Sequence, residues 1–296
     1  MLLFPNLYWL FRTSLINSTL LPHLSSLRLA YKFLLYRLKS FRLHGVHSPF
    51  VFDLYQQVIL HDGIYPAYLL IEDQREELKE NLQEIEVTDF GAGSRITRTY
   101  RRRISDIARI SAKPPKYAQL LFRLVNYFQP GKVLELGTSL GLTTAYLAAA
   151  NKKAAVYTFE GCPNIGKQAL VNFKNLKLKN INLITGNLDQ TLPAFMATVD
   201  QVEFVYFDGN HRYEPTMRYY RLCLQKHTEN SVFVFDDIYW SAEMEKAWKE
   251  ICQDPAVTLS IDLFQIGLVF FRKKQPKQHF TLWFWITYNR ILIVNI

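Results

Sequence analysis

The stretch that decides the fold is "KVLELGTSLGLTTAYLA", residues 132–148. It begins with a short apolar run typical of a buried β-strand, turns at Gly137, and continues after Gly141 as a helix-forming segment. A strand, a glycine turn and a helix in this order let the backbone approach a ligand closely and direct helix N-terminal amides at it. The spacing differs from GxGxxG and no GK[ST] is present, so the sequence favours neither a dinucleotide site nor a P-loop.

Downstream of this stretch, β-branched or aromatic runs alternate with helical segments. We expect strands at 132–136, 155–160, 181–185, 203–207 and 231–235, with helices near 142–150, 164–178, 190–197, 214–226 and 242–253. This alternation predicts right-handed βαβ units on a parallel sheet. At 256–273, "AVTLSIDLFQIGLVFFRK" contains two strand-like runs with no helix between them, which predicts an antiparallel hairpin.

The part of the chain before this core is basic and reads as mainly helical. No acidic residue precedes Asp53, and helical patterns occupy 27–60, 72–85, 97–111 and 116–128. We therefore divide the chain into a basic N-terminal extension at 1–110, a core domain at 111–275 and an apolar tail at 276–296.

The net charge of +9 is spread unevenly, because the stretch before Asp53 contains six basic residues and no acidic one. A one-signed segment suggests an anionic partner, either a membrane surface or nucleic acid, although a solvated segment without a partner is an equal alternative. The apolar N-terminus lacks a basic n-region and a cleavage site, and its longest uncharged run, Met1–Phe11, is too short to span a bilayer. Both apolar ends are expected on a membrane interface, on the core or on a partner subunit.

Three widely spaced cysteines form no disulfide framework and no CxxC pair. They indicate a reducing compartment, so we expect a cytoplasmic protein. Peripheral attachment to a membrane is compatible with that location. Hydrophobic residues at 49% and charged residues at 21% are ordinary for a globular domain with a sizeable core.

A second glycine-rich stretch, "VTDFGAGSRITR" at 87–98, competes for the role of ligand loop. Ligand loops of this type need a strand, a helix and an acid about 20 residues later that binds ribose hydroxyls. Glu160 meets the last condition for the loop at 137–141, whereas "ISAKPPK" stands at the corresponding place after Gly93. We interpret Asp89, Gly91 and Gly93 as a connector between two helices, with a lid over the acceptor pocket as the alternative.

Four motifs in order carry a family resemblance: "VLELGTSLG" (133–141), "FE" (159–160), "YFDGNH" (206–211) and "VFDDIYW" (234–240). Over roughly residues 115–272 the chain resembles class I S-adenosylmethionine-dependent methyltransferases, in particular the metal-dependent O-methyltransferase branch related to catechol O-methyltransferase. The resemblance implies a doubly wound, mostly parallel seven-stranded α/β sheet of the Rossmann-like type. A terminal antiparallel hairpin would complete the sheet, and a helical N-terminal segment would precede it.

The resemblance also implies which residues hold S-adenosylmethionine. The methionine part would be lined by Glu135, Gly137, Thr138, Ser139 and Gly141. Glu160 would hold the ribose, Asn187 and Leu188 would flank the adenine, and Asp208 would complete the site. The family often has an acid where Asn187 stands, which leaves that contact open.

Three carboxylates are expected at one edge of the sheet. Asp208 ends one strand, Asp236 and Asp237 end the next, and the carboxyl ends of parallel strands face a common crevice. Such carboxylates repel one another unless a cation lies between them, and oxygen ligands suit Mg²⁺ or another hard divalent cation. The family has an acid–amide pair at the second position, where this chain has Asp-Asp. The alternative is that Asp236 or Asp237 caps the following helix.

His211 follows Asp208 by three residues, where the metal-dependent family often has a general-base lysine. An imidazole accepts a proton near neutral pH, so we assign Asp208 and His211 to catalysis, with a surface turn histidine as the alternative. Tyr213, Tyr239 and Trp240 are candidates for an aromatic wall or for simple packing. The run at 101–103 is a candidate phosphate site or a solvated helix face.

These observations predict methyl transfer from S-adenosylmethionine to a hydroxyl oxygen of a small molecule, assisted by a divalent cation, by a chain that can form homo-oligomers. Two alternatives stay open. An RNA methyltransferase would suit the basic charge, but the chain has no [ND]PP[YF] motif and no RNA-binding module. The other is a non-catalytic, membrane-associated protein that retains the methyltransferase fold.

Overall fold

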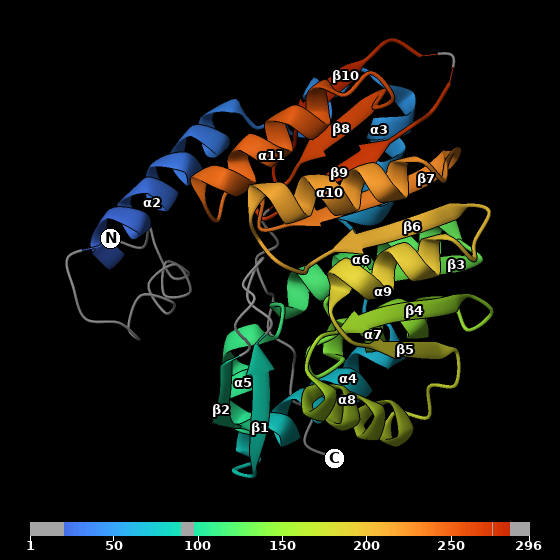
Figure 1. The fold of residues 1–296 in the computed structure, drawn as a ribbon. Coiled ribbons are helices and arrows are strands. Elements are labelled where there is room, and N and C mark those ends of the chain that lie inside the picture. Colours follow the sequence, from blue (N-terminus) through green and yellow to red (C-terminus); the bar gives the residue numbers. More distant parts are fainter. Residues whose placement is uncertain (1–20, 90–97, 274, 285–296) are drawn as a thin grey trace.

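The computed structural model describes residues 21–89, 98–273 and 275–284. Its centre is an eight-stranded sheet of order β10-β8-β9-β7-β6-β3-β4-β5 (Figure 1). The strands of this sheet are β3 (Lys132–Leu136), β4 (Ala155–Glu160), β5 (Ile181–Thr185), β6 (Val202–Phe207), β7 (His227–Asp236), β8 (Leu259–Asp262), β9 (Ile266–Phe270) and β10 (Gln278–Thr281). The predicted Rossmann-like α/β class is confirmed.

Helices cover both faces of the sheet. They are α2 (Leu21–Lys39), α3 (Pro49–Leu54), α4 (Pro66–Glu80), α5 (Ile104–Ser111), α6 (Pro115–Phe128), α7 (Leu142–Ala150), α8 (Pro163–Asn175), α9 (Leu188–Met196), α10 (Tyr213–Leu224) and α11 (Ala242–Gln253). A 3₁₀ turn at Leu43–Gly45 and a π-helical turn at Tyr55–Ile59 interrupt the helical stretch predicted at 27–60. Figure 1 shows α9, α10 and α11 on one side of the sheet and α4, α6 and α7 on the other.

Alternate residues of each central strand supply two separate hydrophobic clusters. In β6, Phe204 and Tyr206 belong to the cluster beneath α6 and α7, whereas Val205 and Phe207 belong to the cluster beneath α10 and α11. Both sets are buried, because a parallel strand of a doubly wound sheet is covered on both faces. This explains why the sequence shows short continuous apolar runs here instead of apolar–polar alternation.

The predicted terminal hairpin is present. Strand β9 runs antiparallel to both β7 and β8, and the predicted seven strands correspond to β3 to β9. An eighth strand, β10, pairs in parallel with β8 and lies in the segment expected as an apolar tail. The hydrogen bond from the Phe41 amide to the Thr281 carbonyl (2.8 Å) ties this strand to the N-terminal region.

One predicted helix is wrong. The segment 97–111 is divided into strand β2 (Arg98–Arg103) and helix α5, and β2 pairs antiparallel with β1 (Glu84–Asp89). The basic run faces the acids of β1, with Glu84 opposite Arg103 and Glu86 opposite Arg101. Opposite charges on directly facing positions stabilise such a pair, a long-range complement that helical periodicity does not show.

This hairpin also changes the interpretation of the opening glycine-rich stretch. Asp89 ends β1 and Arg98 begins β2, so the stretch joins two strands and not two helices. Gly91 and Gly93 lie outside the described residues. Within the described residues, no helix is long and apolar enough to cross a membrane.

Candidate active site

The loop after β3 passes very close to the loop after β6. Gly137 has a φ of +110°, and a Cβ atom there would lie 2.7 Å from the backbone oxygen of Asp208. The Asp208 amide also donates to the Leu136 carbonyl at 3.0 Å. A side chain at position 137 would therefore push apart the two loops that the sequence assigns to cofactor and acceptor.

Three residues with a strained backbone lie just after the carboxyl ends of the central strands. Ser139, Asn210 and Asp237 are non-glycine residues in the left-handed region, with φ values of +49°, +59° and +51°. Each follows the end of a different strand, β3, β6 or β7. Residues held in this region concentrate at ligand sites, because the surrounding structure must enforce the unfavourable backbone.

Glu135 is a fully buried carboxyl below the glycine loop. Its Oε2 accepts hydrogen bonds from the Thr158 hydroxyl at 2.6 Å and from the Thr144 hydroxyl. Its Oε1 is buried and has no hydrogen-bond partner among the described residues. Burial raises the pKa of Glu135 to about 8, although both hydroxyls lower it. An unpartnered buried oxygen at this position is a ready contact for a polar ligand group.

Glu160 ends β4 and reaches across to the same loop. One carboxylate oxygen accepts the Ser139 amide at 2.8 Å, and the other accepts the Cys162 amide at 2.9 Å. Burial raises the pKa of Glu160, while these backbone hydrogen bonds lower it. Each carboxylate oxygen has a second lone pair, so Glu160 retains acceptor capacity toward the crevice.

The third loop, after β5, approaches from the other side. The Gly186 amide donates to the Glu160 carbonyl at 2.9 Å, and the Asn187 side chain caps α9 by accepting the Asp189 amide at 2.9 Å. A Cβ atom at Gly209 would lie 3.3 Å from Leu188 Cδ2, which places Leu188 beside the β6 loop. The adenine contact of Asn187 stays a prediction, because its side chain is used as a helix cap here.

One wall of this crevice was not predicted from the sequence. A pocket is lined on one side by Ile107, Ala108 and Ser111 of α5 and by Ala112, which follows the helix. The other side is formed by residues 137–140, 142, 143 and Asp208. Helix α5 was assigned to the N-terminal extension, away from the core. The signal that could have shown it is the apolar spacing of Ile104, Ile107 and Ala108, which predicts a buried face.

The structure gathers the acidic cluster only in part. Asp208, His211 and Asp236 offer ligand atoms that all lie within 4.8 Å of one another, whereas Asp237 is not in this group. His211 Nε2 lies 3.5 Å from Asp208 Oδ1. The alternative that an aspartate caps the next helix is not what the structure shows, because the Ser241 hydroxyl caps α11 by accepting the Met244 amide at 3.1 Å.

Lys113 lies among these carboxylates and was not predicted as a site residue. Its ammonium contacts Asp236 Oδ2 and lies 3.6 Å from Asp237 Oδ1. The Lys113 side chain is only 6% exposed and that of Asp236 only 2%. Burial disfavours the charge on Lys113, but Asp236, Asp237 and Asp208 outweigh that effect and raise its pKa. Lys113 belongs to "ISAKPPK", the stretch in which we sought only an acid on a strand.

Asp208 and His211 shift each other's pKa. Burial would raise the pKa of Asp208, but the hydrogen bond from His211 and the charge of Lys113 lower it below its usual value. Burial would lower the pKa of His211, but the hydrogen bond and charge of Asp208, together with the charge of Asp237, raise it above 6.5. His211 is thus not an isolated surface histidine.

The other candidates lie apart from this pair. The Tyr213 hydroxyl bonds Glu250 on α11, and the Tyr239 hydroxyl donates to Asp262 Oδ2 at 2.6 Å. Trp240 is 44% exposed. The hydroxyls of Tyr213 and Tyr239 are therefore bonded to other elements, and the aromatic wall stays a prediction.

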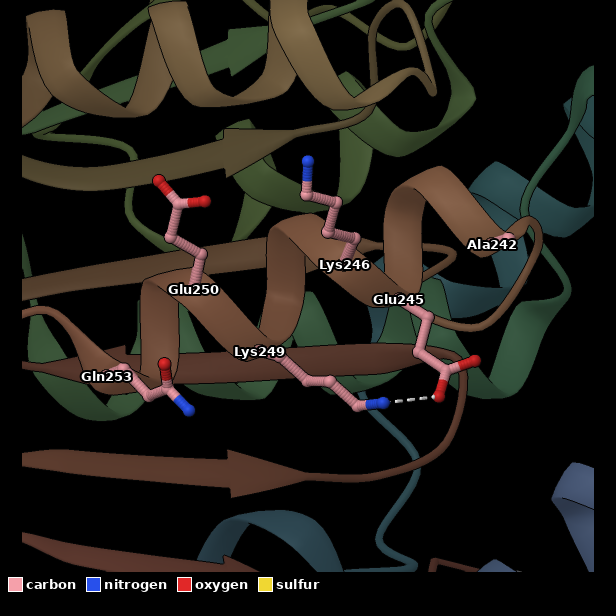
Figure 2. A pocket seen from close by; sticks show the side chains of 6 residues that line it. All are labelled: Ala242, Glu245, Lys246, Lys249, Glu250 and Gln253. Carbon is pink, nitrogen blue, oxygen red and sulfur yellow. Dashed lines mark hydrogen bonds and ion pairs between the residues drawn. The ribbon is translucent and has the colours of Figure 1, made fainter.

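A wider hollow lies along α11, and Figure 2 shows its lining. Its charged groups bond to one another or to neighbouring helices, as in the pair between Lys249 and Glu245 at 2.8 Å. It contains none of the residues that the sequence assigns to cofactor, catalysis or metal. We do not assign it a ligand.

Comparisons with known proteins agree with this geometry. Residues 134–238, from β3 to just beyond β7, match a family described as a methyltransferase domain. Among solved structures, the SAH-bound methyltransferase PaMTH1 of Podospora anserina is 15% identical with a TM-score of 0.53, covering 75% of this chain and 94% of that one. The O-methyltransferase TomG of Streptomyces achromogenes, in complex with SAM, is 15% identical with a TM-score of 0.51, covering 74% and 95%.

A third structure, the O-methyltransferase of Bacillus cereus in complex with SAH, is 16% identical with a TM-score of 0.50, covering 74% of this chain and 97% of that one. At these identities the likeness concerns the fold alone. The assignment of site residues rests on the sequence motifs at the strand ends. Residues 134–238 are therefore similar to a methyltransferase domain, and the chain has the fold of these SAM- and SAH-bound methyltransferases.

Proposed function

We propose that this protein transfers the methyl group of S-adenosylmethionine to a hydroxyl oxygen of a small molecule. One observation carries the proposal: a single pocket joins the glycine loop after β3 to Asp208, whose carboxylate holds His211. A cofactor loop and an acid–base pair thus share one crevice at the carboxyl ends of the strands, where ligands bind in open α/β sheets.

The residues present fit the cofactor. Glu135 Oε1 is buried and without a partner among the described residues, as expected of an atom that receives a hydrogen bond from the methionine ammonium. Glu160 stands over the loop and would accept from the ribose hydroxyls. When bound, S-adenosylmethionine supplies an electrophilic methyl group on a sulfonium sulfur.

On the acceptor side, the chain must remove a proton from the attacking hydroxyl. Asp208 faces His211 Nε2 and orients the imidazole, so Nδ1 is the nitrogen that takes the proton. The negative charge of Asp208 then stabilises the imidazolium that forms. His211 is therefore the proposed general base and Asp208 its partner.

The predicted divalent cation does not fit this site as the structure shows it. Asp208, His211 and Asp236 could supply ligand atoms, but the Lys113 ammonium already contacts Asp236. A dication on the same carboxylate would lie on the order of 4 Å from that ammonium, a repulsion of about 8 kcal/mol at an effective dielectric constant of about 20. No step of the proposed reaction uses a metal.

The basic hairpin favours a small acceptor over nucleic acid. The run at 101–103 faces acids across the strand pair, with Arg101 Nη1 4.0 Å from Glu84 Oε2. Arg102 lies over the ring of Tyr100 at 4.9 Å from its centroid. Paired arginines offer less net charge to a phosphate backbone than an unopposed basic face would.

Binding of S-adenosylmethionine tests the proposal through Glu160. We expect Glu160→Gln to weaken binding by about 10- to 100-fold, because a hydrogen bond to a charged acceptor contributes about 1.5–3 kcal/mol. Isothermal titration calorimetry measures the dissociation constant directly.

Glu203→Gln is the matched control, because Glu203 also accepts a backbone amide, that of Gly131 at 2.7 Å, but at the start of β3. It should bind like the unaltered chain. No detectable binding by the unaltered chain, or equal binding by both variants, would contradict the proposed cofactor site.

A further inference from the structure

We propose that Lys113 is the resident cation of the acceptor site and takes the place that a divalent metal would otherwise occupy. This inference rests on the site of the proposed function, but it concerns the charge at that site and can be tested without methyl transfer. It explains how the buried Asp236 can lie beside Asp208 and Asp237 at one edge of the sheet.

The first step is the charge balance. Asp208 and Asp236 offer carboxylate oxygens within 4.8 Å of each other at the ends of β6 and β7, and Asp237 follows directly. Carboxylates this close, one of them buried, need a compensating positive charge. Lys113 contacts Asp236 and lies 3.6 Å from Asp237, while His211 lies 3.5 Å from Asp208. Lys113 therefore supplies the permanent positive charge of the cluster, and the imidazole of His211 lies beside Asp208.

The second step is the position of Lys113. It lies between α5, which walls the pocket, and α6, whose Pro114–Pro115 start holds the backbone of this segment. Its side chain is almost fully buried, so the ammonium cannot stay charged there without its acidic partners. The contact between Lys113 and Asp236 is therefore a buried ion pair and not a surface one.

The third step is what this charge does. The acceptor oxygen becomes negative as its proton leaves for His211, and a fixed positive charge near it stabilises that state. An ammonium has three N–H donors, and the contacts with Asp236 and Asp237 use at most two. Lys113 is thus a positioning residue for the aspartates and the source of positive charge at the acceptor oxygen.

A Mn²⁺ titration followed by electron paramagnetic resonance tests this inference. We expect the unaltered chain and Lys113→Arg to show no saturable Mn²⁺ site, because both keep the positive charge. Lys113→Met keeps the length but removes the charge, and should gain a saturable Mn²⁺ site at least about tenfold tighter than the non-saturating binding of the unaltered chain. The double variant Lys113→Met/Asp236→Asn should lose that gain.

Methyl transfer supplies the second measurement. Chelation should leave the unaltered chain fully active, and Lys113→Met should lose activity that Mn²⁺ partly restores, which a purely structural role of Lys113 would not produce. A Mn²⁺ site in the unaltered chain that Asp236→Asn abolishes would overturn the inference, even if Lys113→Met fails to fold. Absence of S-adenosylmethionine binding would defeat the proposed function instead, and the Mn²⁺ titration would still decide the question of the cation.

A second, independent observation concerns helix α2. One stripe of this helix is apolar and more than half exposed, comprising Leu27, Tyr31, Leu34 and Leu38. Positions separated by four, three and four residues lie on a single face of a helix. Large exposed apolar stripes of this kind mark interaction surfaces.

The opposite side of α2 fastens the helix to the body. Arg28 and Lys32 both bond Glu245 of α11, each at 2.7 Å, and Phe33 packs edge-to-face on Phe264 with ring centroids 5.1 Å apart. The Phe284 amide donates to the Tyr36 hydroxyl at 2.9 Å. The apolar stripe is therefore the outward face of a held helix, and Figure 1 shows α2 extending beyond the sheet.

Charge identifies the partner of this face. Arg37, Lys39 and Arg42 are exposed at the end of the helix, and no acid precedes Asp53. We infer that the stripe docks on an anionic lipid surface, with its apolar residues at the acyl boundary and its basic residues at the headgroups. A dimer through the same stripe would gain no charge complementarity from α2 itself, because the helix contains no acidic residue.

Vesicle flotation tests this docking face. The full chain should float with vesicles of phosphatidylcholine and phosphatidylserine, and much less with phosphatidylcholine alone or at high salt. Leu34→Glu/Leu38→Glu should reduce the bound fraction by about tenfold, because it places charges in the apolar layer. The matched control is Leu69→Glu/Leu70→Glu, which alters two exposed leucines of α4 and should bind as before.

Two results would overturn this inference. One is unchanged flotation of the α2 variant, which would place membrane binding elsewhere in the chain. The other is that light scattering shows a dimer of the unaltered chain and a monomer of the α2 variant. The stripe would then be a contact between two copies.

Discussion

Asp208→Asn should reduce the rate of methyl transfer by about 10²- to 10⁴-fold while leaving the fold and S-adenosylmethionine binding nearly intact. The substitution keeps the shape of the side chain but removes the negative charge that faces His211 Nε2 at 3.5 Å. Without that charge, the imidazolium formed during proton removal loses its main stabilisation. Steady-state kinetics should show the loss in kcat, with a small change in KM for the cofactor.

The pH profile distinguishes this role from a structural one. A base must be neutral to accept a proton, so the rate should rise with pH through the pKa of His211, which Asp208 raises above 6.5. Asp208→Asn should move the midpoint of the residual activity to lower pH, because the charge that favours the imidazolium is gone. Asp200→Asn, at an exposed position before β6, should change neither the rate nor the midpoint. An unchanged midpoint in Asp208→Asn would refute the pairing of Asp208 with His211.

Gly137→Ala should abolish cofactor binding and lower the free energy of unfolding by roughly 2–5 kcal/mol. Two costs add: the residue has a φ of +110°, and the new Cβ atom would meet the Asp208 backbone oxygen at 2.7 Å. The Asp208 carbonyl group cannot move away at low energetic cost, because it belongs to the backbone at the end of a buried strand. Urea unfolding and calorimetric titration with S-adenosylmethionine measure the two effects.

Gly131→Ala is the matched control for Gly137→Ala, because Gly131 directly precedes strand β3. A Cβ atom there would lie 3.4 Å from Glu203 Oε1, the end of a flexible side chain, at an ordinary contact distance. Its stability should change by less than about 1 kcal/mol, with cofactor binding retained. Equal behaviour of the two variants would show that the close approach of the β3 and β6 loops is not needed for the site.

Much of the core fold could be predicted because its signals are local. The run at 132–136 and its glycine turn specify a strand, a tight loop and a helix within one short segment, and each later βαβ unit repeats this logic. Glu160 could be placed for the same reason, since a strand end fixes where a residue lies on a parallel sheet. The strands at 155–160 and 181–185 match those bounds in the structure.

The hairpin β1–β2 could not be predicted in this way. Its stability depends on pairing of acids at 84–86 with arginines at 101–103, a complement between two segments that each have helix-compatible composition. Helical periodicity within 97–111 described only its second half, α5. Tertiary pairing therefore overrode the local preference of the first half.

In the candidate site too, some features follow from the local sequence and others from tertiary packing. The sequence alone determined the strand–loop–helix of 132–148 and the acids at the strand ends, because parallel topology brings such ends together whatever lies between them. Only the tertiary structure decided what neutralises those acids. Lys113 lies 123 residues before Asp236, on a segment without periodic signal, and packing of α5 and α6 against the sheet brings its ammonium to the carboxylates. A charge balance depends on distances in space, and residue spacing in the sequence does not give them.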